Sequence, residues 1–318
     1  TVTITAAGLQ GLTEGSVTMT ADVSDAAGNA AAQVTSSAFT YDKTAPTISQ
    51  VTSTTNDGSY NVPDEINITV GFSEAVTLSG GNLVVTLDTG GTATISSITA
   101  ASTASATYTV GSGETSADLS ATGIALSAGT LTDAAGNAMS VFGGYTDLAD
   151  SSALVVDTTV PTISAIGTGA LSWGAVLNAT EDNSNGTVSV TTSGAEDGQT
   201  VTITLNGATY TNTVSSDATT VTITAAALQA LTDGQSYTLT ADVSDAAGNA
   251  AAQVTSSSFA VDTTLPTISA IATSALSWGA VLNATEDNSN GTVSVTTSGA
   301  EDGQTVTITL NGDTYTNT

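Results

Sequence analysis

Residues 198–214 read GQTVTITLNGATYTNTV, and this stretch decides the fold. Apolar residues at 201, 203 and 205 alternate with threonines at 202 and 204, which is the period of a strand with one buried face. The Asn-Gly pair at 206–207 then predicts a two-residue hairpin turn. Beyond this turn we expect Ala208 to lie opposite Leu205, and Tyr210 opposite Ile203, on the same face.

A second alternating run lies further along the chain, at Tyr237, Leu239, Ala241 and Val243. Short strands separated by Gly, Asn and Asp turns over roughly 100 residues are typical of an immunoglobulin-like β-sandwich. Helical periodicity is nearly absent. The segment 225–231 (AAALQAL) could form one helical turn, but the pattern favours the end of a strand.

Internal repeats define the organisation of the chain. Residues 161–213 recur almost unchanged at 266–318, a shift of 105 positions, and residues 220–266 recur at 1–46 with one deletion near Ser16. Residues 46–160 differ in sequence but carry, at 133–137, the same Asp-Ala-Ala-Gly-Asn segment that residues 161–265 carry at 245–249. We predict four parts: 1–45, the C-terminal half of an Ig-like repeat; 46–160, an Ig-like repeat of a second type; 161–265, a complete repeat; and 266–318, an N-terminal half.

One boundary motif separates these parts and contains three of the four prolines. It reads YDKTAP at 41–46, VDTTVP at 156–161 and VDTTLP at 261–266. Proline cannot donate to a sheet ladder and forces the preceding residue into an extended conformation. The predicted fold class is therefore all-β, with tandem immunoglobulin-like β-sandwich domains joined by short, stiff, proline-containing linkers.

The composition excludes several classes of function. The 318 residues include 29 acids, one base (Lys43), no His and no Cys, with a formal net charge of −28. An imidazole base, a thiolate nucleophile and the usual zinc site are therefore ruled out. One lysine cannot neutralise a nucleic-acid backbone, so no nucleic-acid partner is expected. No apolar run reaches the ~20 residues that span a bilayer, so no membrane insertion is expected in this segment.

Together these motifs resemble the bacterial Ig-like repeats that form the extender regions of large RTX-type and biofilm-associated surface adhesins. The resemblance rests on GQTVTITLNGATYTNTV, on the repeated DAAGN and on the D-x-T-x-P linkers. Residues 46–160, with NDGSYNVPDEINITVGFSEAV, resemble a second Ig-like type that alternates with the first. The resemblance implies an extracellular, cell-surface stalk without enzymatic activity, and Ca²⁺ at the junctions between repeats. The glycine-aspartate nonapeptides of RTX segments are absent.

Acidic residues fall in the linkers and in turns that an Ig-like strand order would bring to one pole of each sandwich. Carboxylates gathered without lysine or arginine would repel one another, and flexible oxygen ligands select Ca²⁺. We predict that Ca²⁺ is bound jointly by the turns of one repeat and by its linker. The bound ion would restrict bending at the linker and stiffen the fibre. Candidate ligands in the first two repeats are Asp25, Asn29, Asp42, Glu74, Asp133 and Asn137. The remaining candidates are Asp157, Glu196, Asp197, Asp245, Asn249, Asp262, Glu301 and Asp302. Glu181, Asp182 and Asp233 are expected at the opposite pole, facing the next linker.

A simpler interpretation stays open for each acidic turn. Asp and Asn bond to their own backbone in turns, and Gly248 can supply a positive φ. On this interpretation the acids are solubilising surface charge. Trp173 and Trp278 are expected to pack in the core or at a junction between repeats, and stacking on a sugar is the lesser alternative.

The ends of the chain suggest a further hypothesis. Thr318 aligns with Thr213 and Thr1 with Thr220, so the two terminal halves would nearly add up to one repeat. We expect a window on a longer array. The alternative is a self-assembling filament in which identical chains complete each other head to tail by strand addition. Neighbouring repeats of the same protein are the expected partners. A ligand-binding adhesive module is a third hypothesis, but the few aromatic residues do not cluster.

Overall fold

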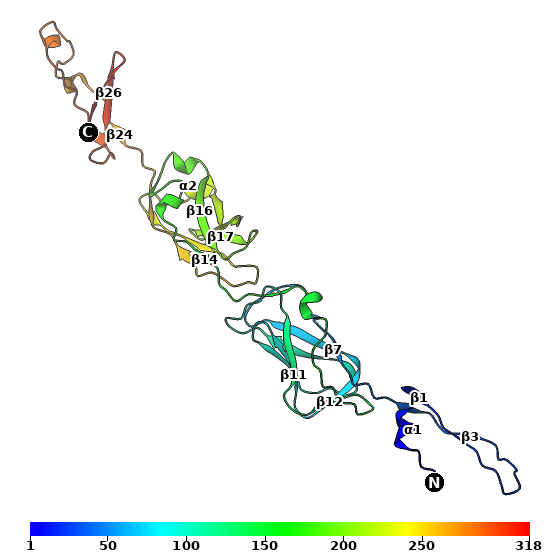
Figure 1. Cartoon of the computed structure of the whole chain (residues 1–318). Helices are drawn as coiled ribbons and strands as arrows, with labels where there is room; N and C mark the ends of the chain where they lie inside the picture. The colour runs from blue at the N-terminus through cyan, green and yellow to red at the C-terminus, as the bar shows by residue number, and fades with distance from the viewer. The chain divides into compact units, whose positions relative to one another are not determined.

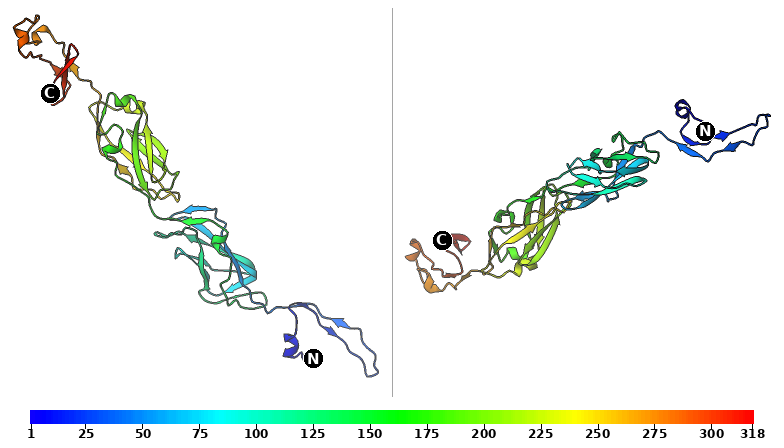
Figure 2. Two further views of the ribbon diagram at one scale, coloured as in Figure 1. Left: turned by 45° about the horizontal axis from the view of Figure 1, so that its top comes forward. Right: turned by 90° about the horizontal axis from the view of Figure 1, so that it is seen from below.

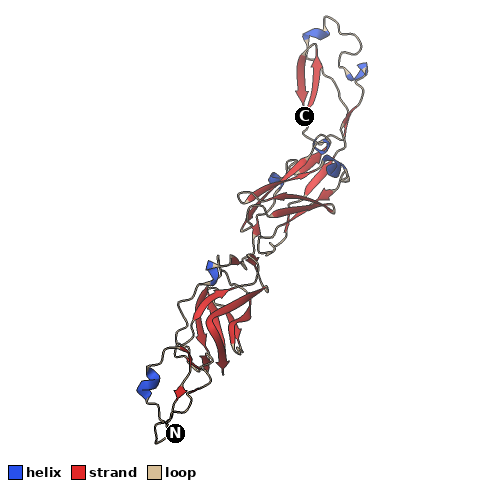
Figure 3. Cartoon of the chain, turned by 90° about the vertical axis from the view of Figure 1, so that its right-hand side faces the viewer, coloured by secondary structure: helices blue, strands red, loops and turns tan.

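The computed structural model describes all 318 residues, and its regular structure is almost entirely β-strand (Figure 3). Its contacts divide it into two compact units, residues 1–160 with 246–249 and residues 161–245 with 250–318. Two apolar cores form, one with buried side chains between Ile48 and Val156 and one between Ile163 and Val261. No helix has the length and apolar character needed to cross a membrane. The all-β sandwich class is confirmed, while the four-part division stays a prediction.

Residues 46–160 fold into two sheets that enclose the first core (Figure 1). The first sheet has the order β10-β7-β12, with β5 also paired to β7, and the second has the order β11-β8-β9. Strands β6 and β13 form a parallel pair beside them. The bounds are β5 (Ile48–Thr52), β6 (Gly58–Tyr60), β7 (Glu65–Ser79), β8 (Leu83–Leu87), β9 (Thr92–Ile95), β10 (Ala101–Thr109), β11 (Ala121–Leu126), β12 (Thr130–Thr132), η1 (Leu148–Asp150) and β13 (Leu154–Val156).

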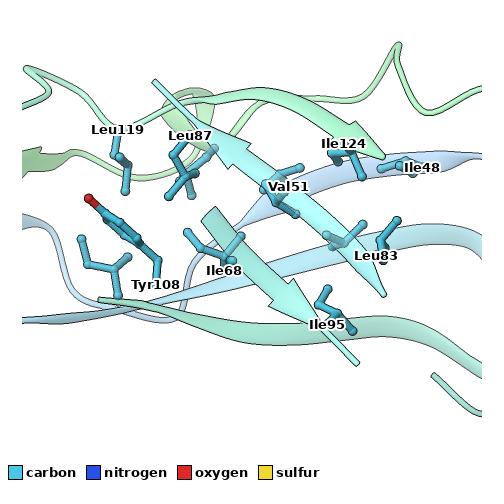
Figure 4. Close-up of a cluster of buried hydrophobic side chains, with 14 of the residues drawn as sticks. Ile48, Val51, Ile68, Leu83, Leu87, Ile95, Tyr108, Leu119 and Ile124 are labelled. Carbon is cyan, nitrogen blue, oxygen red and sulfur yellow. The ribbon is translucent and has the colours of Figure 1, made fainter. Parts of the chain in front are cut away.

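The first core is built from the inward residues of both sheets (Figure 4). Ile68 from β7 and Leu83 and Leu87 from β8 are all buried in this cluster. Tyr108 is buried at one end of this core, and its hydroxyl donates to the Glu114 carboxylate at 2.6 Å. Burial, together with this bond to Glu114, raises the pKa of Tyr108 to about 12. The hydroxyl of Tyr108 is therefore protonated and uncharged at neutral pH.

Residues 161–265 form a second sandwich from three sheets. Their orders are β14-β16-β19, β18-β17-β21-β22 and β15-β23-β20. The bounds are β14 (Thr162–Ile163), η2 (Thr168–Ala170), β15 (Val176–Asn178), η3 (Glu181–Asn183), β16 (Gly186–Ser193), β17 (Thr200–Leu205), β18 (Ala208–Thr213), β19 (Ala218–Ile223), α2 (Ala225–Gln229), β20 (Ser236–Tyr237), β21 (Leu239–Asp242), β22 (Val254–Thr255) and β23 (Phe259–Asp262).

The predicted hairpin at 206–207 is confirmed in register. Leu205 pairs with Ala208 and Ile203 with Tyr210. Asn206 (φ 49°) and Gly207 (φ 80°) both adopt the left-handed conformation that this tight turn requires. Local sequence was sufficient here because the turn type and the alternation specify the same pairing.

The expectation of a strand end at 225–231 was wrong, because Ala225–Gln229 forms the helix α2. The Thr224 hydroxyl accepts from the Ala227 backbone N–H and caps the helix N-terminus. Leu228 turns into the core and is fully buried. Tertiary packing of this leucine therefore selects the helix over the extended alternative.

Trp173 packs in the second core, as predicted, with its ring edge-on to Phe259 at a centroid distance of 5.3 Å. Gly186 on β16 lies directly beneath this indole. A Cβ at Gly186 would come within 2.5 Å of the Trp173 ring, so the glycine makes room for the tryptophan.

The terminal segments form only fragments of a sandwich. In residues 1–45 these are α1 (Ala6–Gln10), β1 (Gly15–Val17), β2 (Thr20–Ala21), β3 (Val34–Thr35) and β4 (Phe39–Tyr41). In residues 266–318 they are β24 (Thr267–Ile268), η4 (Thr273–Ala275), η5 (Glu286–Asn288), β25 (Thr297–Ser298), β26 (Val306–Leu310) and β27 (Asp313–Asn317). Figure 2 shows both segments, in blue and in red, as single ribbons without a second covering sheet.

Candidate metal centre

The turn at 133–137 follows strand β12 and closes on itself. The Asp133 carboxylate accepts from the backbone N–H of Asn137 (2.9 Å) and from its side-chain amide (2.7 Å). The Asp133 N–H donates in turn to the Asn137 carbonyl at 3.2 Å. These bonds fix the carboxylate of Asp133, which is 5% exposed, at the end of the sandwich.

The equivalent turn at 25–29 has the same geometry. Asp25 accepts from the Asn29 backbone N–H and from its side-chain amide, both at 2.8 Å. The glycines in these turns, Gly28, Gly136 and Gly248, have φ between 89° and 92°. The turn-forming role of these residues, and the positive φ of Gly248, are therefore confirmed.

The asparagine of the turn also holds the linker that leads into its repeat, which we call the leading linker. The Asn137 amide donates to the backbone carbonyl of Asp42 at 3.3 Å. Likewise, the Asn249 amide donates to the carbonyl of Asp157 at 2.9 Å. Each linker carboxylate accepts from the backbone N–H two residues on, from Thr44 to Asp42 at 3.0 Å and from Thr159 to Asp157 at 2.8 Å.

Glu74 brings a third carboxylate to the Asp42 linker. It lies on β7, where Val70, Phe72 and Val76 on the same alternation are buried. A half-buried glutamate therefore takes a position on the core-facing side of the strand. Ligand oxygens of Asp42, Glu74 and Asp133 all lie within 4.8 Å of one another, and we call these three residues the carboxylate cluster.

The three carboxylates of the cluster have no positively charged side chain among the charges that act on Glu74. Burial raises the pKa of Glu74, and the nearby charges of Asp133 and Asp42 raise it further. Burial also acts to raise the pKa of Asp133, but the hydrogen bonds from Asn137 outweigh it and leave that pKa lowered. The chain's single lysine, Lys43, lies over the Tyr41 ring at 6.0 Å and is not among the charges that act on Glu74.

The donor set of the cluster fits a hard divalent cation. Three carboxylates offer up to six oxygens, and Ca²⁺ takes 6–8 oxygen ligands in flexible geometry. Nitrogen and sulfur ligands, which softer metals prefer, are lacking because the chain has no His or Cys. Burial and, to a smaller extent, the charges of Asp133 and Asp42 raise the pKa of Glu74, and a bound cation would favour its ionised form.

The other predicted ligands are placed as follows. Asp245 is buried and Glu196 is exposed. The Asp197 carboxylate accepts from the Ser216 backbone N–H at 2.7 Å, so it supports a turn of its own sandwich. A metal role for these three residues and for Asp157 and Asn249 stays a prediction. The side chains of Asp25, Asn29, Glu301 and Asp302 are exposed in the terminal segments, and that of Asp262 is exposed at the end of β23. None of them forms a cluster like that of Asp42.

The linker that follows each repeat, its trailing linker, is held by a second set of contacts. As expected from sequence, Asp233 reaches this linker: its carboxylate accepts from the Thr263 N–H (2.7 Å) and the Thr264 hydroxyl (2.6 Å). By contrast, the Glu181 carboxylate accepts from the Asn178 N–H at 3.1 Å, within its own loop.

Sequence reasoning missed the same contact at Glu14, which accepts from the Lys43 N–H (2.9 Å) and the Thr44 hydroxyl. The alignment of Thr13-Glu14-Gly15 with Thr232-Asp233-Gly234 was the available signal. In residues 46–160 the Thr158 hydroxyl donates instead to the Glu114 carbonyl at 3.0 Å. Thr44 and Thr264, the threonines of two D-x-T-x-P motifs, thus bind the preceding repeat, whereas at 157–161 this contact comes from Thr158, one position earlier.

Comparison with known proteins gives one family match. Residues 122–260 match the bacterial Ig-like domain (group 3). No curated protein matches the chain.

Among solved structures, a bacterial Ig-like domain from the M. primoryensis ice-binding adhesin is 34% identical, covering 32% of this chain and 95% of its own (TM-score 0.24). A Ca²⁺-stabilised adhesin with which an Antarctic bacterium binds ice is 28% identical over 95% of this chain and 70% of its own (TM-score 0.41). A 1.5-MDa bacterial ice-binding adhesin is 25% identical over 83% of this chain and 79% of its own (TM-score 0.40). All three TM-scores lie below 0.5.

Proposed function

We propose that this chain, which belongs to the bacterial immunoglobulin-like domain family, is an extender segment of an extracellular surface adhesin that Ca²⁺ stiffens at its linkers. The 34% identity to an Ig-like domain of an adhesin supports this assignment. Tandem sandwiches and a charge of −28 suit a stalk that stays soluble and does not collapse on itself. The proposal gives the chain a mechanical role at the cell surface and no catalytic one.

The carboxylate cluster is the observation that carries the proposal. Asp42 belongs to the leading linker, Glu74 to strand β7 and Asp133 to the turn after β12. These three residues would hold the ion. When bound, Ca²⁺ supplies the positive charge that this part of the chain lacks. Because the ligands come from both linker and sandwich, their sharing of one ion restricts the rotation of the linker.

Hydrogen bonds within the protein preorganise this site. The Asn137 amide donates to both the Asp133 carboxylate and the Asp42 carbonyl, so the turn and the linker are held together before any ion binds. Binding therefore costs little ordering of these two groups. Glu74 is the ligand whose charge is least favourable without an ion, and it gains most from one.

Calcium titration of the full chain tests the proposal. A ligand that binds only the native state stabilises it by RT ln(1 + [L]/Kd), which is about 2.7 kcal/mol at 100 times Kd. We expect added Ca²⁺ to raise the midpoint of the calorimetric transition of residues 46–160, EDTA to reverse the shift, and Mg²⁺ to be less effective. Small-angle scattering of the same samples should show a larger radius of gyration with Ca²⁺.

An identical calorimetric profile in Ca²⁺ and in EDTA would remove calcium from the proposal. A thermal shift without any change in radius of gyration would leave a metal site that does not stiffen the linker. Isothermal titration calorimetry separates these cases because it counts bound ions independently of shape.

A further inference from the structure

Lys43 is the only basic residue in the chain, and it lies in a linker. The motif YDKTAP has lysine at the position where the other two linkers have Thr158 and Thr263. Lys43 and Thr44 are exposed and lie outside any strand. The peptide bond that follows the only lysine is therefore at the surface, in a segment that joins two repeats.

Hydrogen bonds occupy both backbone N–H groups beside this peptide bond. The Lys43 N–H donates to the Glu14 carboxylate at 2.9 Å, and the Thr44 N–H donates to the Asp42 carboxylate at 3.0 Å. The Thr44 hydroxyl also donates to Glu14, at 2.9 Å. The bonds from Lys43 and Thr44 lower the pKa of Glu14, so its carboxylate is charged and accepts hydrogen bonds at neutral pH. Glu14 thus holds the linker on both sides of the Lys43–Thr44 bond.

The side chain of Lys43 stays accessible while its backbone is held. Its ammonium group lies over the Tyr41 ring, 6.0 Å from the centroid, and the residue is exposed. Proteases of the trypsin type bind such a side chain in a pocket that contains an aspartate. In a chain with 29 acidic residues and one base, Lys43 is the one side chain that such a pocket can recognise.

The held linker does not have the conformation in which a protease takes its substrate. An extended peptide is bound through its backbone N–H and C=O groups, as an added strand. Here the Asp42 carboxylate bonds to the N–H two residues on, which forms a turn, and Glu14 occupies the N–H of Lys43. These bonds must open before cleavage. When opening and closing are fast, the rate of cleavage follows the population of the open form.

We propose that the Lys43–Thr44 bond is a regulated cleavage site for a protease that cuts after lysine, and that Glu14 is the latch that keeps this site closed. In the cleavage, water adds across the amide: its hydroxyl group joins the carbonyl carbon of Lys43, its hydrogen joins the nitrogen of Thr44, and the C–N bond breaks. Cleavage severs the chain at this linker and spares the two linkers that have Thr158 and Thr263 instead. The proposal goes beyond the stalk function and does not depend on calcium.

Limited digestion of the full chain with trypsin, in EDTA, tests the latch. We expect one cut, after Lys43, identified by mass spectrometry. The cut should be several-fold faster in Glu14→Ala, which removes the acceptor for both residues, and intermediate in Glu14→Gln, which keeps one accepting oxygen. Asp22→Asn removes a charge from the same segment at a side chain that accepts from Gln33, so this control should be cut like the parent. An uncut parent chain, or equal rates in Glu14→Ala and the parent, overturns the proposal.

The complete repeat has the same latch, which allows the site to be moved. Asp233 accepts from the Thr263 N–H at 2.7 Å and from the Thr264 hydroxyl at 2.6 Å, as Glu14 does from the first linker. Thr263 occupies the position that aligns with Lys43. Lys43→Thr combined with Thr263→Lys transfers the only lysine to this second linker. The cut should move with it, and a chain that resists cleavage there contradicts the proposal.

Adding Asp233→Ala to this relocated site separates opening of the latch from loss of the fold. We expect a several-fold faster cut while the thermal midpoint of residues 161–265 stays that of the relocated parent. Trp173 fluorescence in a Trp278→Phe background measures this midpoint, because Trp173 is buried in that core. An unchanged rate, or a faster cut that appears only together with a lower midpoint, overturns the proposal.

Discussion

The side-chain amide of Asn137 donates to the backbone carbonyl of Asp42 at 3.3 Å, ninety-five positions earlier in the chain. The next repeat has the same bond, from Asn249 to Asp157 at 2.9 Å. The Asp-Ala-Ala-Gly-Asn turn, which recurs in both repeats, therefore does more than reverse the chain direction. Its aspartate organises the loop, and its asparagine binds the linker.

We first predict that Glu74→Gln stabilises the calcium-free protein and weakens its response to calcium. Burial and the charges of Asp133 and Asp42 raise the pKa of Glu74, so its ionised form weakens the fold near neutral pH. The free energy of unfolding, measured in EDTA by urea titration, should be higher in the variant. Added Ca²⁺ should then raise it less than in the parent chain.

The pH dependence of this effect follows from the direction of the shift. Because the folded pKa of Glu74 lies above 4.5, its stabilising contribution is complete below pH 4.5 and is lost as pH rises through the folded value. The advantage of Glu74→Gln should therefore vanish in acid. Glu65→Gln, an exposed position on the same strand, is the control and should show neither effect.

Asn137→Ala should destabilise residues 46–160 by roughly 1–3 kcal/mol, since one bond to a carboxylate and one to a carbonyl are lost. Amide hydrogen exchange resolved by residue follows the unfolding of residues 46–160 separately, because tyrosines lie in both sandwiches and cannot distinguish them. Asn56→Ala, at an exposed loop position, should change stability by less than about 0.5 kcal/mol. Equal effects of the two substitutions would show that the Asn137 bonds contribute nothing.

Asp233→Ala should release the trailing linker at Thr263 and Thr264. The carboxylate accepts from the Thr263 N–H at 2.7 Å, so amide exchange at Thr263 should become several-fold faster. The Thr264 hydroxyl and the Thr263 N–H lower the pKa of Asp233. In the parent chain, protection is therefore complete above pH 3.8 and is lost as pH falls through the lower folded value. Asp182→Ala, on the same sandwich, should leave Thr263 protected.

Gly186→Ala should destabilise residues 161–265 by roughly 1–3 kcal/mol, because its Cβ would overlap the Trp173 ring. Trp173 fluorescence in a Trp278→Phe background follows this unfolding. Gly169→Ala is the control, since Gly169 lies in the same sandwich, in η2, but has open space at its Cβ position. It should be neutral or slightly stabilising. An unaffected Gly186→Ala protein would mean that the indole can shift away without cost.

Much of the fold could be predicted because its determinants are local. Alternation at 201–205 and the Asn-Gly pair at 206–207 set one hairpin to the residue, and the repeats carried that prediction along the chain. The helix α2 was not predicted because a segment of five residues has little intrinsic tendency to form a helix. Only the fit of Leu228 into the core decides its conformation.

The candidate site divides in the same way between local and distant causes. The sequence by itself determined tandem β-sandwiches, linkers marked by D-x-T-x-P, and acidic turns, because period, turn chemistry and repetition are properties of neighbouring residues. Only the tertiary structure decided which of the predicted acids meet: Asp42, Glu74 and Asp133 do, while Asp197 bonds to Ser216. It also decided that Glu14 and Asp233 hold linker threonines. The physical reason is that strand pairing sets which carboxylates converge, and pairing depends on residues far apart in the chain.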